Sequence, residues 1–140
     1  MLLDVVTPQD PRPVLRRIAA EAVILSDEAE DVLRRIRARQ GLGFVAPRGG
    51  PLVRRFFALR DELPECHEAP ELRIRGQLDV ILHHHAMLIS LAMDLLAAEW
   101  RSERISAQID ALDGMGEPAR FLELIYSELA GRPSGPVTTG

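Results

Sequence analysis

A long apolar run near the middle of the chain, LDVILHHHAMLISLAMDLLAA at residues 78–98, constrains the fold more than any other feature. It is long enough in principle to cross a bilayer. However, it contains five side chains that are costly inside hydrocarbon: Asp79, His83, His84, His85 and Asp94. We therefore expect this run to form the buried central helix of a water-soluble bundle, and we expect no membrane partner.

Helical periodicity extends over most of the 140 residues outside the Pro- and Gly-rich stretches, and no segment alternates as a strand would. The sequence therefore predicts an all-α fold: a single-domain bundle of four to six helices, with a central apolar helix around residues 71–100. We expect the domain to span residues 1–131. Residues 132–140 follow Gly131 and are rich in Pro and Gly, which predicts a disordered tail.

Residues 13–40 allow two interpretations. Apolar residues recur there every three or four positions without a phase slip, which favours one continuous helix. However, acidic residues followed by arginines match the dipole of a separate second helix, and Ser26 could serve as its N-cap. Of these alternatives we favour two helices, or one helix that is bent at Ser26.

The remaining helix boundaries follow from Pro, Gly and Ser positions. The segment 41–50, GLGFVAPRGG, has the composition of a loop, and Pro51 suits the first position of a helix that runs to about Leu63. Beyond the central helix the apolar stripe changes phase, so we expect Ser102 to cap a new helix. Pro118 is expected to open the last helix.

Composition excludes several kinds of chemistry. All 17 basic residues are arginine, so the chain lacks the lysine that Schiff bases, P-loops and Ser-Lys dyads require. The single cysteine, Cys66, excludes an intrachain disulfide and any multi-thiolate metal site. These features predict a cytoplasmic protein, and the lysine-free composition is typical of a GC-rich bacterial coding sequence.

Charge is unevenly distributed along the chain. Residues 32–60 contain eight arginines and no acidic residue, whereas residues 61–140 carry a net charge of −8. Because the guanidinium fork suits carboxylate and phosphate, we expect Arg48, Arg54 and Arg55 to form a surface for an acidic partner. The alternative is that the two halves neutralise each other, within one subunit or across a dimer.

Some arginines have obvious expected partners. Glu30 and Arg34, like Asp31 and Arg35, are four residues apart with the acid first, which favours pairing within a helix. Arg60 falls on the apolar side of its predicted helix, so we expect it to pair with a carboxylate from the acidic half of the chain or from a partner subunit.

The central helix contains the best candidate metal ligands. Asp79 and His83 are one helical turn apart, and Asp94 lies on the same polar strip. This spacing suits either an Asp–His hydrogen bond or, with ligands from another helix, a metal or small-ligand site. His85 is surrounded in the helical pattern by apolar residues and is expected in the core.

These observations favour a non-enzymatic helical interaction or regulatory protein that self-associates as a homo-oligomer and needs no cofactor. Its arginine surface would contact an acidic partner. A first alternative is a bundle that binds a metal or small ligand through Asp79 and His83. A second is a protein that binds the nucleic-acid backbone; it is less favoured, because the net charge is −4 and only 4% of residues are aromatic.

Overall fold

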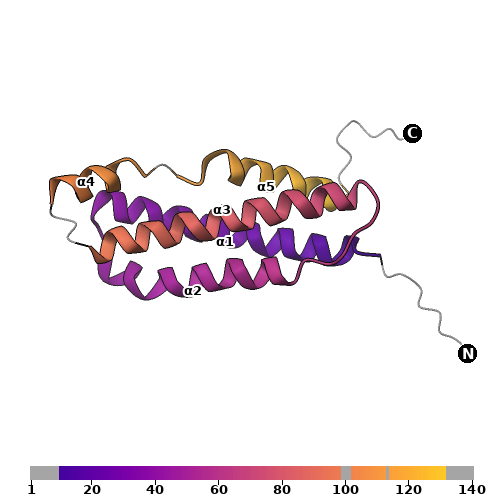
Figure 1. The fold of residues 1–140 in the computed structure, drawn as a ribbon, viewed down its shortest axis with the longest axis horizontal. Coiled ribbons are helices and arrows are strands. Elements are labelled where there is room, and N and C mark those ends of the chain that lie inside the picture. Colours follow the sequence, from indigo (N-terminus) through magenta and orange to yellow (C-terminus); the bar gives the residue numbers. More distant parts are fainter. Residues whose placement is uncertain (1–9, 99–101, 113, 132–140) are drawn as a thin grey trace, which may run out of the picture.

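The computed structural model describes residues 10–98, 102–112 and 114–131, and within them five α-helices. These are α1 (Arg12–Ala38), α2 (Leu42–Asp61), α3 (Glu71–Ala97), α4 (Glu103–Asp110) and α5 (Gly116–Leu129). The first three helices alternate in direction, and α4 and α5 together return along the bundle as a broken fourth rod (Figure 1). The predicted all-α bundle is confirmed, while the tail predicted at 132–140 lies outside the described residues.

The core is built around α1 and α3. α1 contacts each of the other four helices, and α3 packs most extensively on α2. The largest fully buried side chains come from all five helices and the turn before α5: Leu15, Ile18, Leu33, Ile36, Phe56, Leu59, Ile74, Leu78, Leu82, Ile89, Ile109 and Met115, with Leu122 close in size. Each such burial stabilises the fold by about 1.5–3 kcal/mol before entropy is counted. The central position predicted for the apolar helix is therefore observed.

α1 runs without interruption through Ser26, so our preference for two helices was wrong. The Ser26 side chain is buried, and its hydroxyl lies 2.9 Å from Nε2 of His85 on α3. Ala22 and Ala29, on either side of Ser26, are both fully buried in the same core. Burial of one continuous apolar face outweighs the capping and dipole signals, each of which is small.

His85 is fully buried with both ring nitrogens satisfied. Nδ1 lies 3.0 Å from the Ile81 carbonyl oxygen, which only accepts, so Nδ1 carries the proton and Nε2 accepts from the Ser26 hydroxyl. The pKa of His85 is lowered to about 4, chiefly by burial; the hydrogen bond to Ile81 opposes this shift, and the neighbouring His84 contributes to it. His85 is therefore neutral near pH 7, as a core histidine must be.

α2 begins at Leu42, so the loop predicted at 41–50 and the helix start predicted at Pro51 were both wrong. Val45 and Gly49 are buried and continue the apolar stripe of the helix backwards. Pro47 and Pro51 both lie inside α2 but on its exposed side. The carbonyls that lose their helical donors there face water, which makes the prolines tolerable.

The N-termini of α4 and α5 are held by two different capping contacts. The Ser102 hydroxyl accepts the Ile105 N–H at 3.2 Å, which confirms Ser102 as the N-cap of α4. α5 begins two residues before the predicted Pro118. A carboxylate from α1, Glu30, accepts the N–H of Met115 at 2.8 Å and so holds the start of α5 against α1.

The bundle is least closed along the side where α3 faces α4 and α5. α5 rests mainly on α1, and α3 meets α4 and α5 over a much smaller interface than it shares with α2. Within the described residues α2 does not contact α4 or α5. A seam between α3 and the α4–α5 rod is therefore left partly uncovered, and two hollows in the described part of the chain lie along it.

The buried histidine predicts a specific acid sensitivity. The unfolded chain takes up a proton on residue 85 below about pH 6.5, whereas the folded protein resists it until about pH 4. The free energy of unfolding should therefore fall as pH drops through this window, by up to about 3 kcal/mol. Urea unfolding at several pH values measures this loss.

The test variant is His85→Gln, which replaces the buried histidine. The matched control is His84→Gln, which replaces its exposed neighbour. We expect His85→Gln to flatten the pH dependence between pH 6.5 and 4 and His84→Gln to preserve it. Equal slopes in both variants would contradict the assignment.

Candidate interaction surface

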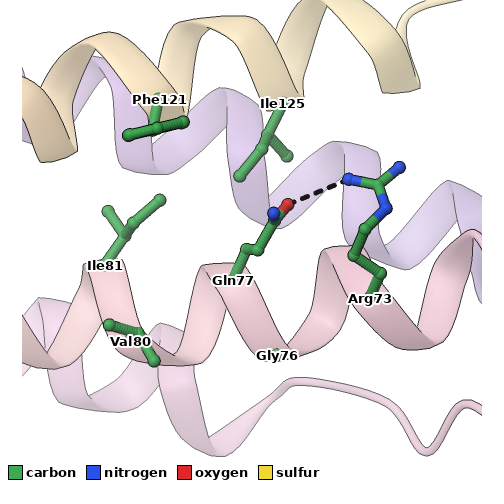
Figure 2. Close-up of a pocket in the computed structure, with 7 residues that line it drawn as sticks. All are labelled: Arg73, Gly76, Gln77, Val80, Ile81, Phe121 and Ile125. Atoms are coloured by element: carbon green, nitrogen blue, oxygen red, sulfur yellow. Dashed lines mark hydrogen bonds between the residues drawn. The ribbon is translucent and has the colours of Figure 1, made fainter.

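The first hollow on the α3–α5 seam has a volume of about 400 Å³ and an almost wholly apolar lining. Figure 2 shows Phe121 and Ile125 reaching down from α5 towards Ile81 on α3, with Val80 at the edge. At one end of the hollow, Arg73 donates to the Gln77 side-chain oxygen at 3.1 Å (Figure 2). The polar groups thus lie at the end of the hollow, and its walls offer apolar surface.

A second hollow of about 620 Å³ continues the seam towards α4. Its apolar lining comes mainly from α3, through Leu88, Leu91 and Leu95, while His84 and Glu117 provide polar groups. The two hollows lie against successive turns of the same helix. We call these two hollows together the seam groove.

α3 also presents a continuous row of exposed residues to solvent, which we call the α3 outer face. Apart from the adjacent His83 and His84, its members are spaced three or four residues apart, so they lie on one side of the helix. They are Arg73, Gly76, Val80, His83, His84, Met87, Leu91 and Asp94, all classed as exposed. Apolar side chains flank the two histidines at its centre: Val80 is 68% exposed, and Met87 and Leu91 are about half exposed.

α5 adds the large apolar side chain of Phe121 beside this face. Phe121 and Leu124 are both more than half exposed, and Phe121 shares the first hollow with Val80. Surface apolar residues are ordinary when scattered singly, but a contiguous patch beside a groove marks a contact surface. The seam groove and the α3 outer face are therefore the strongest candidate interaction surface in the described part of the chain.

The composition of α3 leads to the same conclusion. Among the described residues it is the one helix long and apolar enough to cross a membrane by length and composition, a test that core helices of soluble proteins also pass. Only 39% of the residues in its most apolar 18-residue stretch are fully buried in the bundle, and the exposed ones include Val80, Met87 and Leu91. α3 therefore carries more apolar surface than its neighbours in the fold cover.

The three arginines predicted to face a partner have different surroundings. Arg55 forms an ion pair with Glu21 of α1, and Arg48 donates to the Phe44 carbonyl oxygen at 2.7 Å. Arg54 is exposed and has no hydrogen bond or ion pair to any described residue. All three belong to α2, but only Arg54 points its charge freely into solvent.

Much of the remaining arginine charge is neutralised inside the chain. Asp31 pairs with Arg35 at 2.9 Å as expected and also with Arg34, because the expected partner of Arg34, Glu30, instead binds α5. Other pairs join the two halves of the sequence: Arg12–Glu71, Arg17–Glu62, Arg39–Asp110 and Arg60–Asp79. The structure thus shows contacts of the kind that the neutralisation alternative requires.

One exposed aromatic ring, Phe44, lies within residues 32–60, the segment with eight arginines that we call the arginine region. The guanidinium of Arg48 lies 3.5 Å from the Phe44 ring centroid, and that of Arg35 lies 4.5 Å from it. Phe44 thereby holds two cations at the end of the bundle where α1 and α2 meet. The contact explains how this loop-like sequence is stabilised as the first turn of α2.

Two of the three proposed metal ligands, Asp79 and His83, contact a cation that the chain itself supplies. Arg60 of α2 pairs with Asp79 and donates to Nδ1 of His83 at 3.2 Å. Asp94 is fifteen residues beyond Asp79 on the same helix, about 22 Å along its axis. Among the described residues no three His, Cys, Asp or Glu side chains are grouped to hold a metal.

Cys66, in the connector between α2 and α3, is buried. Burial raises the pKa of its thiol; Glu71 adds to this effect, and Arg75 opposes it. The thiol is therefore held in its protonated, less nucleophilic form.

The sequence analysis missed the α3 outer face. It placed the wide apolar side of the central helix in the core, which is where Leu78, Leu82 and Ile89 are found. The overlooked signal was the second apolar row formed by Val80, Met87 and Leu91. A helix that is apolar on two sides must be covered on two sides.

Comparisons with protein families, curated proteins and solved structures find no match to this chain. Function is therefore inferred from the surface and from the chemistry of its residues.

The Arg60 contacts generate a prediction that separates an ion pair from a metal site. Arg60→Met should lower the free energy of unfolding by at most about 1 kcal/mol, because Arg60 and Asp79 are about one-third exposed. Saturating Zn²⁺ should leave the Tm of the wild-type protein unchanged. Differential scanning calorimetry measures both effects, with Arg54→Met on the same helix as the control.

A Zn²⁺-dependent rise in Tm that His83→Ala abolishes would contradict this expectation and support the metal alternative.

Proposed function

We propose that the chain is a non-enzymatic interaction protein that self-associates through the α3 outer face and the adjoining part of α5. The observation that carries this proposal is the exposure of Val80, Met87 and Leu91 on one side of α3. Exposed apolar surface of this kind is unfavourable in water and is normally covered by a partner.

The size of the patch fits a second copy of the chain as the partner. A large apolar side chain at half exposure leaves on the order of 100 Å² uncovered. Val80, Met87, Leu91, Phe121 and Leu124 therefore contribute about 500 Å² per copy, or about 1,000 Å² when two copies pair. Polar residues around the edge add to this area, which reaches the range of specific interfaces.

The arginine region is the second candidate surface. Arg54 is exposed without a partner among the described residues, and Arg48 and Arg35 hold the exposed Phe44 ring between them. An acidic protein or a nucleic-acid backbone could contact these groups. We rank this surface below the α3 outer face, because internal ion pairs neutralise much of its charge.

Sedimentation equilibrium from about 1 to 100 µM tests self-association, and one pair of variants locates the surface. Val80→Glu places a carboxylate in the proposed interface and should weaken dimerisation at least tenfold. Ile24→Glu is the matched control, because Ile24 is 67% exposed on α1 and Val80 is 68% exposed. It should leave the dimer intact.

A wild-type protein that stays monomeric up to about 100 µM would overturn the proposal. So would a dimer that Ile24→Glu weakens as much as Val80→Glu does.

A further inference from the structure

We infer that two copies pair antiparallel along α3, with a two-fold axis between His83 and His84. This inference rests on the proposed self-association and specifies its geometry. It accounts for three features of the α3 outer face that the single chain leaves unexplained: the symmetry of its exposed positions, the placement of its end charges and a glycine in mid-helix.

Four pairs of exposed residues are placed symmetrically about the midpoint between His83 and His84. Leu72 is exposed but does not belong to this set, because its counterpart, Leu95, is buried. The pairs are His83 with His84, Val80 with Met87, Gly76 with Leu91, and Arg73 with Asp94. An antiparallel two-fold dimer brings the members of each pair opposite each other, because such an interface is self-complementary. The central set 80, 83, 84 and 87 also has the spacing of a helix–helix contact.

The end charges favour the antiparallel direction. Arg73 lies near the start of the α3 outer face and Asp94 near its end, so antiparallel pairing joins opposite charges at both ends of the interface. Parallel pairing would instead bring Arg73 against Arg73 and Asp94 against Asp94, which is repulsive. Arg73 already donates to Glu128 at 2.8 Å and to Gln77. Its guanidinium has five N–H donors, so it can still bind Asp94 of a second copy.

Gly76 supplies the third argument. Glycine weakens a helix interior, and a Cβ at this position would meet nothing within 4 Å in the single chain. No contact inside the fold therefore requires glycine here. In the antiparallel dimer Gly76 lies opposite Leu91 of the second copy, so a missing side chain leaves room for a large one.

Pulsed electron paramagnetic resonance tests the direction of pairing in the full-length dimer. A spin label on Ala97→Cys, in a Cys66→Ala background, sits beyond the end of the charged pairs and changes none of them. Antiparallel pairing about the His83–His84 midpoint places the two labels about 40 Å apart along the helix axis. Parallel pairing places them within about 20 Å, and that result would overturn the inference.

A charge exchange tests the register independently. Arg73→Glu and Asp94→Arg should each raise the dimer Kd about tenfold, and the double variant should return it to within about threefold of wild type. Arg54→Glu is the control and should leave the Kd unchanged. Because Arg73→Glu also breaks the Glu128 contact, recovery in the double variant is the decisive observation.

The outcomes separate the two proposals. A monomeric wild type overturns self-association and the register with it. A dimer that Val80→Glu disrupts, but that shows a short label distance or no recovery in the charge exchange, overturns only the antiparallel register.

Discussion

The amount of apolar surface on α3 is the constraint on which the rest of the structure depends. α1 and α2 bury one side of this helix, and α5 is held chiefly against α1. The remaining side keeps Val80, Met87 and Leu91 in solvent. Because a three-helix core and one broken rod cannot surround α3, the fold leaves the seam groove open and concentrates its exposed apolar residues there.

A buried polar contact sets how α1 and α3 lie against each other. The Ser26 hydroxyl and the His85 ring satisfy one another inside an otherwise apolar core, with Ile81 accepting from the second ring nitrogen. Sliding either helix by one turn would leave a ring nitrogen of His85 buried without a hydrogen-bond partner. The free-energy cost of that unsatisfied group exceeds the cost of less exact packing between apolar side chains. Apolar burial supplies most of the stability of the bundle, and this contact restricts its register.

Apolar periodicity predicted the all-α class, the central helix and the Ser102 cap, because each depends on local spacing. The errors arose where tertiary contacts override local signals. Ser26 has the chemistry of a cap, but its hydroxyl is used by a histidine 59 residues away. The prolines of α2 mark a loop by composition, yet both lie on the side that faces water. The seam groove depends on how far α5 stands from α3, and no local pattern encodes that spacing.

The carboxylate of Glu30 fastens the start of α5 to α1, not to α3. The two walls of the seam groove are consequently held by different helices. The α3 wall packs on α2, whereas the α5 wall packs on α1. Small sideways displacements of α5 would break few contacts with α3. The width of the seam groove can therefore change at a low cost in free energy. We therefore expect the width of the seam groove to adjust to an occupant more readily than the interior of the bundle does.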